Sequence, residues 1–270
     1  MPPVRPPLTT PKKYNLLTNL TQIKALLFDC DNTLVLSEHW AFEACAQLAN
    51  EILAKYAPSP KPAAYTGPEL QSEFVGQNFR GMMLGLFDKY KFTIPDAEFD
   101  AYTERELGKV IENLERNATE CPGASAACEK YLKEGKYDLA IVSSSAMPRV
   151  LASIDKVGQD KYFPRDKVFS AASSLNPPTS KPNPAIYLHA CEKLGVKPSE
   201  AVAIEDSKSG ATAAKNAKIP LMGYVGPYYE EGGVEKVKQM EKMLVEECGA
   251  IVVMHDWKDF DACLEKVIQH

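Results

Sequence analysis

The 270-residue sequence lacks the features that mark membrane and nucleic-acid-binding proteins. No apolar run approaches the ~20 residues that cross a bilayer, so we expect no membrane-spanning helix. No basic stripe is present, and 31 basic against 36 acidic residues give a net charge of −5, which argues against a nucleic-acid partner. The first 13 residues hold five prolines and no apolar core segment, so we expect a loose tail over residues 1–20 and not a secretory signal.

Cysteine and histidine are present but are not arranged as metal sites. The seven cysteines form no Cys-x-x-Cys pair, and the four histidines are scattered along the chain. This pattern favours free thiols in a reducing compartment, and we therefore expect a cytoplasmic protein. With 45% hydrophobic and 25% charged residues, the composition is that of a globular protein, as one large domain or as a core with an insertion.

Short apolar strands alternate with helices along most of the chain. An apolar run over residues 23–28 reads as a buried strand. Further strands are predicted over residues 139–142, 168–169, 201–204, 221–225 and 251–254, and helices over residues 124–134, 148–155, 184–194, 209–217, 234–247 and 258–269. The alternation predicts an α/β fold with a Rossmann-like three-layer α/β/α core, in which helices cover both faces of a mostly parallel sheet.

Polar side chains stand where the predicted strands end. They are Asp29 and Asp31, then Ser143, then Glu205 and Asp206, with Lys181 in the loop before the last pair. The carboxyl ends of parallel strands form the usual ligand site of such a sheet. If the first strand continued, alternation would turn Asp29 and Asp31 to the same side, where they could share one magnesium ion.

Each of these residues also has a simpler explanation. Asp29 and Asp31 could form a solvated turn that ends the strand, and Ser143 could cap a helix. Lys181 could be a solvated loop lysine, and the pair of acids at 205 and 206 could cap the next helix. Their joint occurrence at the strand ends favours a functional site.

The same positions resemble the four ordered motifs of the haloacid dehalogenase-like (HAD) hydrolase superfamily. The first resembles residues 28–34 and the second residues 139–143. The third resembles Lys181-Pro182 ahead of a helix, and the fourth residues 203–207 followed by Gly210. Relatives that cleave carbon–halogen bonds lack the second aspartate of the first motif, and those that cleave phosphonates replace it. Because Asp31 is present, the chain resembles the phosphate-transferring branch.

The resemblance implies a role for each catalytic position. Asp29 would attack phosphorus and form an aspartyl-phosphate. Asp31 would protonate the departing alkoxide and then deprotonate the attacking water. Ser143 would donate a hydrogen bond to a phosphoryl oxygen, a role that Ser144 could share. Lys181 would neutralise charge on the nucleophile and the phosphate.

A magnesium site is implied beside the nucleophile. Asp29 and Asp206 would hold Mg²⁺ together with the backbone carbonyl of Asp31. Glu205 would act through water or orient the other ligands. The backbone amides of Asn32 and Thr33 would face the phosphate.

Residues 40–117 read almost wholly as helix, with helices predicted over residues 38–56, 69–75, 79–90 and 96–114. Their place after the first motif resembles the small helical C1-type cap of the family, which closes over the site and excludes water. We therefore expect a core domain over residues 21–39 and 118–270. Within residues 76–81, Asn78 and Arg80 are candidate substrate contacts. The alternative is that Asn78 caps a helix and Arg80 lies in solvent.

The leading function is a magnesium-dependent phosphatase acting on a small phosphorylated metabolite of the sugar or polyol phosphate type. A phosphomutase of the β-phosphoglucomutase type has the same core and a similar cap. A non-catalytic binding protein is a remote third reading, opposed by the intact motifs. The fold does not choose among substrates, and the sequence does not indicate an oligomeric state.

Overall fold

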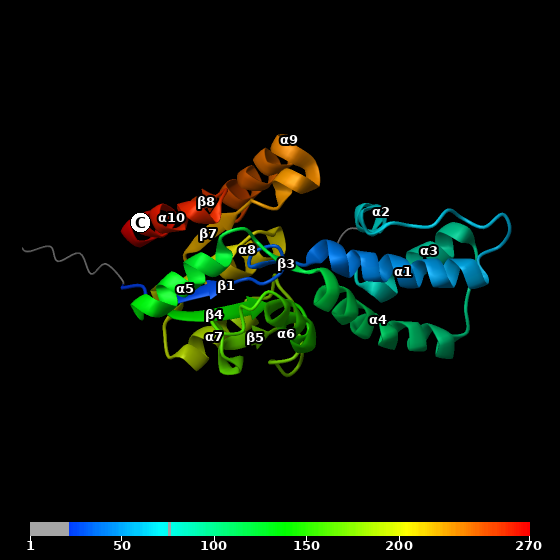
Figure 1. The fold of residues 1–270 in the computed structure, drawn as a ribbon, viewed down its shortest axis with the longest axis horizontal. Coiled ribbons are helices and arrows are strands. Elements are labelled where there is room, and N and C mark those ends of the chain that lie inside the picture. The colour runs from blue at the N-terminus through cyan, green and yellow to red at the C-terminus, as the bar shows by residue number, and fades with distance from the viewer. Residues whose placement is uncertain (1–21, 75–76) are drawn as a thin grey trace, which may run out of the picture.

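The computed structural model describes residues 22–74 and 77–270, and the predicted tail lies outside this range. A six-stranded parallel sheet in the order β5-β4-β1-β6-β7-β8 forms the centre of the larger domain (Figure 1). Its strands are β1 (Ala25–Phe28), β4 (Asp138–Ser143), β5 (Val168–Ser170), β6 (Ala201–Glu205), β7 (Leu221–Tyr224) and β8 (Val252–Met254). The helices around it are α5 (Ala124–Glu134), α6 (Met147–Lys156), α7 (Ala185–Leu194), α8 (Lys208–Asn216), α9 (Tyr228–Lys242) and α10 (Phe260–Gln269).

Alternation along the strands builds a separate core on each face of the sheet. In β1, Leu26 and Phe28 join the cluster that includes α5, α6 and α10. Ala25 and Leu27 point the other way and join the cluster that includes α7 and α8. Successive strand residues face opposite sides, so continuous apolar strands need helices on both faces. The predicted three-layer α/β fold is confirmed.

The helical insertion has an apolar core of its own. It comprises α1 (Glu38–Tyr56), α2 (Gly67–Glu73), α3 (Phe79–Tyr90) and α4 (Asp96–Asn117), which lie to one side of the sheet (Figure 1). Leu48, Met83 and Phe99 are among the buried residues of this core. The two connections to the sheet domain pair with each other as antiparallel strands, β2 (Val35–Leu36) and β3 (Thr119–Glu120). This arrangement supports our proposal that residues 40–117 form a cap domain.

The ends of two helices differ from the sequence prediction. The helix predicted over residues 69–75 begins earlier, at Gly67, because Thr66 and Glu69 form a capping box; residue 75 lies outside the described residues. α9 starts at Tyr228, but its backbone is non-helical at Gly232 and Gly233, so the part after this break matches the predicted start at residue 234. The predicted helix then ends in a π-helix over Met243–Glu247. In the described part of the chain, we find no helix with both the length and the apolar character that crossing a membrane requires.

Candidate active site

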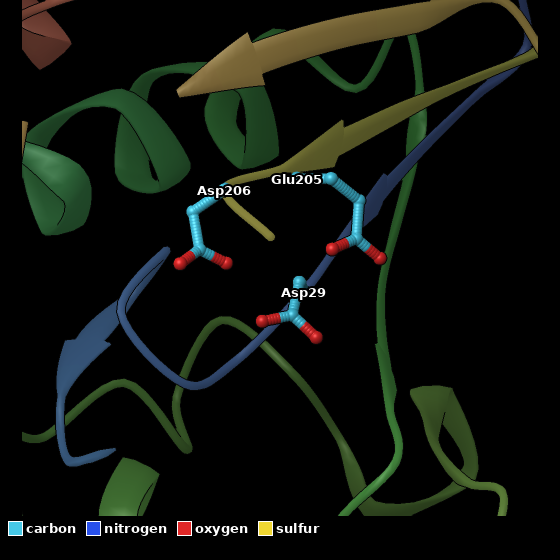
Figure 2. Close-up of side chains that lie close together, drawn as sticks. All are labelled: Asp29, Glu205 and Asp206. Atoms are coloured by element: carbon cyan, nitrogen blue, oxygen red, sulfur yellow. The ribbon is translucent and has the colours of Figure 1, made fainter. Parts of the chain in front are cut away.

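Three buried carboxylates meet where β1 and β6 end. Phe28 pairs with Ile204 in parallel register, so Asp29 and the pair Glu205-Asp206 leave the sheet side by side (Figure 2). One ligand atom from each of these three residues lies within 4.8 Å of the others. All three side chains are buried. The sheet register therefore brings Asp29 to two acids that follow it by more than 170 residues in the sequence.

Lys181 is enclosed by this carboxylate cluster. Its Nζ donates hydrogen bonds to Asp29 Oδ1 at 2.5 Å, to Glu205 Oε1 at 2.6 Å and to the Val142 carbonyl at 2.7 Å. The side chain is only 3% exposed. Burial disfavours the charged ammonium, but the two carboxylates outweigh this effect and raise the pKa of Lys181. The site therefore holds a fixed positive charge against the predicted nucleophile.

The carboxylate oxygens that Lys181 leaves free fit a hard divalent cation. Glu205 Oε2 is buried and has no hydrogen-bond partner among the residues that the structure describes. Burial raises the pKa of Asp29 to about 8, although Lys181 opposes this shift. Burial, together with the neighbouring Asp29, also raises the pKa of Asp206. A cation would relieve this cost, and clustered carboxylate oxygens are the ligands that Mg²⁺ prefers.

Two hydroxyl groups fix the carboxylate of Asp206. Tyr228 Oη donates to Asp206 Oδ2 at 2.9 Å, and Thr33 Oγ1 donates to Asp206 Oδ1 at 3.4 Å. Tyr228 comes from the start of α9. Such outer contacts hold a metal ligand in one orientation.

The start of α8 makes room for Glu205. Ser207 caps this helix by accepting a hydrogen bond from the Gly210 amide at 3.2 Å. A Cβ at Gly210 would overlap the Glu205 carboxylate, which Lys181 and Tyr187 hold in place. The glycine of the fourth motif is therefore needed for space.

We expect Gly210→Ala to destabilise the protein by about 1–3 kcal/mol, because a methyl group must displace a pinned buried carboxylate. Gly108→Ala is the matched control, since Gly108 lies inside α4 with open space around it. That control should be neutral or stabilising by up to about 1 kcal/mol. Urea denaturation of both variants checks the difference, and equal midpoints would contradict this account of Gly210.

Asp31 is held by a different set of partners from Asp29. Its carboxylate accepts hydrogen bonds from Ser37 at 2.5 Å and Ser145 at 2.7 Å, and it lies 3.5 Å from an Arg149 nitrogen. Burial works against the charged form, yet Arg149 and the two serines hold the pKa of Asp31 below its usual value. β1 ends at Phe28, and the chain turns at Asn32, whose φ is 56°. The expectation that Asp29 and Asp31 point to the same side assumed that β1 continues past Phe28. It does not continue, and a tight turn sets the direction of Asp31.

The three serines at the end of β4 bind three different groups. Ser143 is buried at the strand end, and its Oγ accepts a hydrogen bond from the Ser145 amide at 3.0 Å. Ser144 Oγ accepts a hydrogen bond from the Lys181 amide at 3.1 Å. Ser145 reaches Asp31. This segment thus links the loop of Lys181 to Asp31, and the sequence prediction missed Ser145 although it named the two serines before it.

The predicted substrate contacts make hydrogen bonds within the protein. The backbone amides of Asn32 and Thr33, which were expected to face the phosphate, donate to the carbonyls of Val35 and Cys30 at 2.7 and 3.4 Å. The Asn32 side chain donates to Glu38 at 2.9 Å and to Glu231 at 3.1 Å. Asn78 caps α3, as the alternative reading predicted. Arg80 is half-exposed, forms an ion pair with Asp100 at 2.7 Å, and still lines a cavity together with Asn78.

The parallel sheet and the acidic site at its edge define a class of hydrolase, and comparison with known proteins identifies the same class. A model of the haloacid dehalogenase-like hydrolases matches residues 23–218, and the chain belongs to this family. It is 28% identical over 197 residues to the phosphorylated carbohydrates phosphatase of Thermotoga maritima, covering 73% of this chain and 82% of that protein. It is also 28% identical over 216 residues to a phosphoglycolate phosphatase of Psychrobacter arcticus, covering 73% and 81%. Within its family, the chain is a phosphoric monoester hydrolase.

A solved structure shows the same fold. The HAD hydrolase of Entamoeba histolytica superposes with a TM-score of 0.70 at 22% identity, covering 92% of this chain and all of that one. At this level of identity the likeness concerns architecture alone.

Proposed function

We propose that this hydrolase is a magnesium-dependent phosphatase of small sugar or polyol phosphates that works through an aspartyl-phosphate on Asp29. One observation carries the proposal. Asp29, Asp206 and Glu205 meet at one point of the sheet edge, and Lys181 fixes a positive charge against two of them. Phosphoryl transfer depends mainly on such positioning and charge.

The roles of the residues follow from their contacts. Asp29 presents its second carboxylate oxygen to phosphorus while Lys181 holds the first. Ser143, or Ser144 beside it, would donate a hydrogen bond to a phosphoryl oxygen. The amides of Asn32 and Thr33 are not assigned this role, because they donate to the carbonyls of Val35 and Cys30. Mg²⁺ would be held by Asp29, Asp206 and the carbonyl of Asp31, with Glu205 acting through water or orienting the other ligands. It would supply charge neutralisation at the phosphoryl oxygens.

Asp31 completes the reaction as acid and then base. Its rest position on Ser37, Ser145 and Arg149 keeps the carboxylate ready to turn toward the departing oxygen. It protonates the leaving alkoxide and then takes a proton from the water that hydrolyses the aspartyl-phosphate. Because one carboxylate serves both steps, its loss slows both.

Metal dependence is the first test of the proposed function. Phosphate release from a panel of sugar and polyol phosphates should require added Mg²⁺ and should stop on chelation with EDTA. Asp206→Asn should lower the affinity for Mg²⁺ by roughly 10–100-fold or more, because it removes one ligand charge. Asp166→Asn, at an exposed position, is the matched control and should behave as the wild type. Full activity of the chelated enzyme would contradict a metal-dependent mechanism.

A second test separates the two chemical roles of Asp31. Asp31→Asn should lower turnover of an alkyl phosphate by roughly 10²–10⁴-fold, because no acid protonates the leaving alkoxide. With p-nitrophenyl phosphate the leaving group needs no proton, so formation of the phosphoenzyme should be nearly normal and its hydrolysis slow. A burst of nitrophenol followed by a slow phase is the expected result. Equal losses in both steps with both substrates would refute the assignment.

The mutase remains the second candidate, and the same assay separates it from the phosphatase. Isomerised product in excess of free phosphate would identify a mutase. We also propose a cytoplasmic location, which is supported by seven free and buried cysteines.

A further inference from the structure

A cavity of about 390 Å³ lies between the helical insertion and Arg149, the side chain that contacts Asp31. Its walls are α1, α3 and α4 on the cap side and Arg149 of α6 on the core side. Arg149 lies 3.5 Å from the Asp31 carboxylate, and Glu38 of the wall binds the neighbouring Asn32. Asp31 would protonate the departing oxygen, and its contact with Arg149 connects that step to this cavity, which has room for the rest of a leaving group.

Glu106 is the acidic residue that the cap contributes to this cavity. It projects from α4, and its carboxylate accepts a hydrogen bond from the Cys45 thiol at 3.8 Å, a weak partner. Arg149 enters from α6, and its Nε is buried without a partner among the described residues. The lining of the cavity therefore includes a carboxylate acceptor from α4 and a guanidinium donor from α6.

The charges around the cavity disfavour a second anion. Glu38 and Glu106 both line it, while the guanidinium of Arg80 is paired with Asp100 and that of Arg149 faces Asp31. Burial raises the pKa of Glu38 to about 7 and also raises that of Glu106, so negative charge is already costly here. A carboxylate or phosphate placed beside them would add like-charge repulsion. A hydroxyl group adds none, and it can donate to Glu106 while accepting from Arg149.

We propose that Glu106 is a specificity-determining residue. With Arg149 it binds the hydroxyl groups of an uncharged polyol leaving group, and it excludes leaving groups that carry a distal carboxylate or second phosphate. This inference rests on the proposed phosphatase function and deepens it. Arg80, the cap residue that the sequence singled out, is less suited to this role because its guanidinium is already paired with Asp100.

Two substrates of equal length test the proposal. A hexitol 6-phosphate and 6-phosphogluconate differ at the distal carbon, where one carries a hydroxymethyl group and the other a carboxylate. We expect the wild type to prefer the hexitol phosphate by roughly tenfold or more in kcat/KM. Glu106→Gln keeps an acceptor oxygen and removes the charge, so it should retain hexitol phosphate turnover within a few-fold and lose most of the discrimination.

Glu106→Lys removes the acceptor and reverses the charge. We expect kcat/KM for the hexitol phosphate to fall by roughly 10–100-fold and the preference to turn toward 6-phosphogluconate. Glu104→Lys, an exposed position on the same helix, is the matched control and should keep the wild-type ratio. Magnesium-dependent hydrolysis of p-nitrophenyl phosphate shows that each variant is folded and active.

The outcomes separate the inference from the function beneath it. No phosphate release from any substrate by the wild-type enzyme would overturn the proposed function, and the inference would fail with it. Normal phosphate release with the same substrate ratio in the wild type, Glu106→Gln and Glu106→Lys would overturn the inference alone. A wild-type preference for 6-phosphogluconate would also overturn it.

Discussion

Asp29→Asn is expected to abolish phosphate release, with kcat lowered by at least about 10⁴-fold. An amide has nearly the shape of the carboxylate but cannot attack phosphorus, so the aspartyl-phosphate cannot form. The variant should remain folded, because burial already disfavours the charge on Asp29 and raises its pKa to about 8. Phosphate release with a sugar phosphate and saturating Mg²⁺ measures the effect.

The control for this prediction is a substitution of the same kind far from the site. Asp160 is exposed, and Asp160→Asn should leave kcat unchanged. Activity of Asp29→Asn within tenfold of the wild type, after deamidation has been excluded by mass spectrometry, would contradict nucleophilic catalysis by Asp29.

Lys181→Met is expected to cause the largest loss of stability, about 3–5 kcal/mol. The ammonium compensates two carboxylates in a place where its side chain is 3% exposed. Methionine fills the space but leaves Asp29 and Glu205 without a counter-charge. Since a domain is stable by only about 5–15 kcal/mol, the loss should be evident in urea denaturation. Turnover should also fall by roughly 10²–10³-fold, because a charge that faces the phosphoryl group is lost.

Lys208 supplies a matched control for this effect. Its Nζ pairs with Glu247 at 2.6 Å, the distance at which Lys181 pairs with Glu205, but its side chain is 65% exposed. Lys208→Met should therefore change stability by less than about 1 kcal/mol. Adding Glu205→Gln to Lys181→Met should restore part of the stability, since one unpaired buried charge is removed. Equal effects of Lys181→Met and Lys208→Met would show that burial does not set the strength of these pairs.

The sequence predicts the central part of the site because that part depends on strand ends. Asp29, Ser143 and Asp206 each follow an apolar strand, and a parallel sheet brings such ends to one edge. The register of β1 and β6 then places the acids together without any long-range information beyond the strand pattern.

Other contacts could not be predicted because they depend on how distant surfaces pack. Arg149 reaches Asp31 from α6, and Tyr228 reaches Asp206 from the start of α9. Neither residue carries a local signal of its role. Thr66 did carry one, since Thr-x-x-Glu ahead of a helix is a capping box, and reading it would have corrected the start of α2.

The covalent intermediate on Asp29 is the central claim, and it can be observed directly. The Asp31→Asn enzyme is mixed with p-nitrophenyl phosphate and Mg²⁺, quenched in acid during turnover, and digested for peptide mass spectrometry. We expect the peptide that contains residue 29 to gain the mass of one phosphoryl group, with the modification on Asp29. Nitrophenol release without any phosphorylated peptide, or with the phosphoryl group on another residue, would contradict the mechanism.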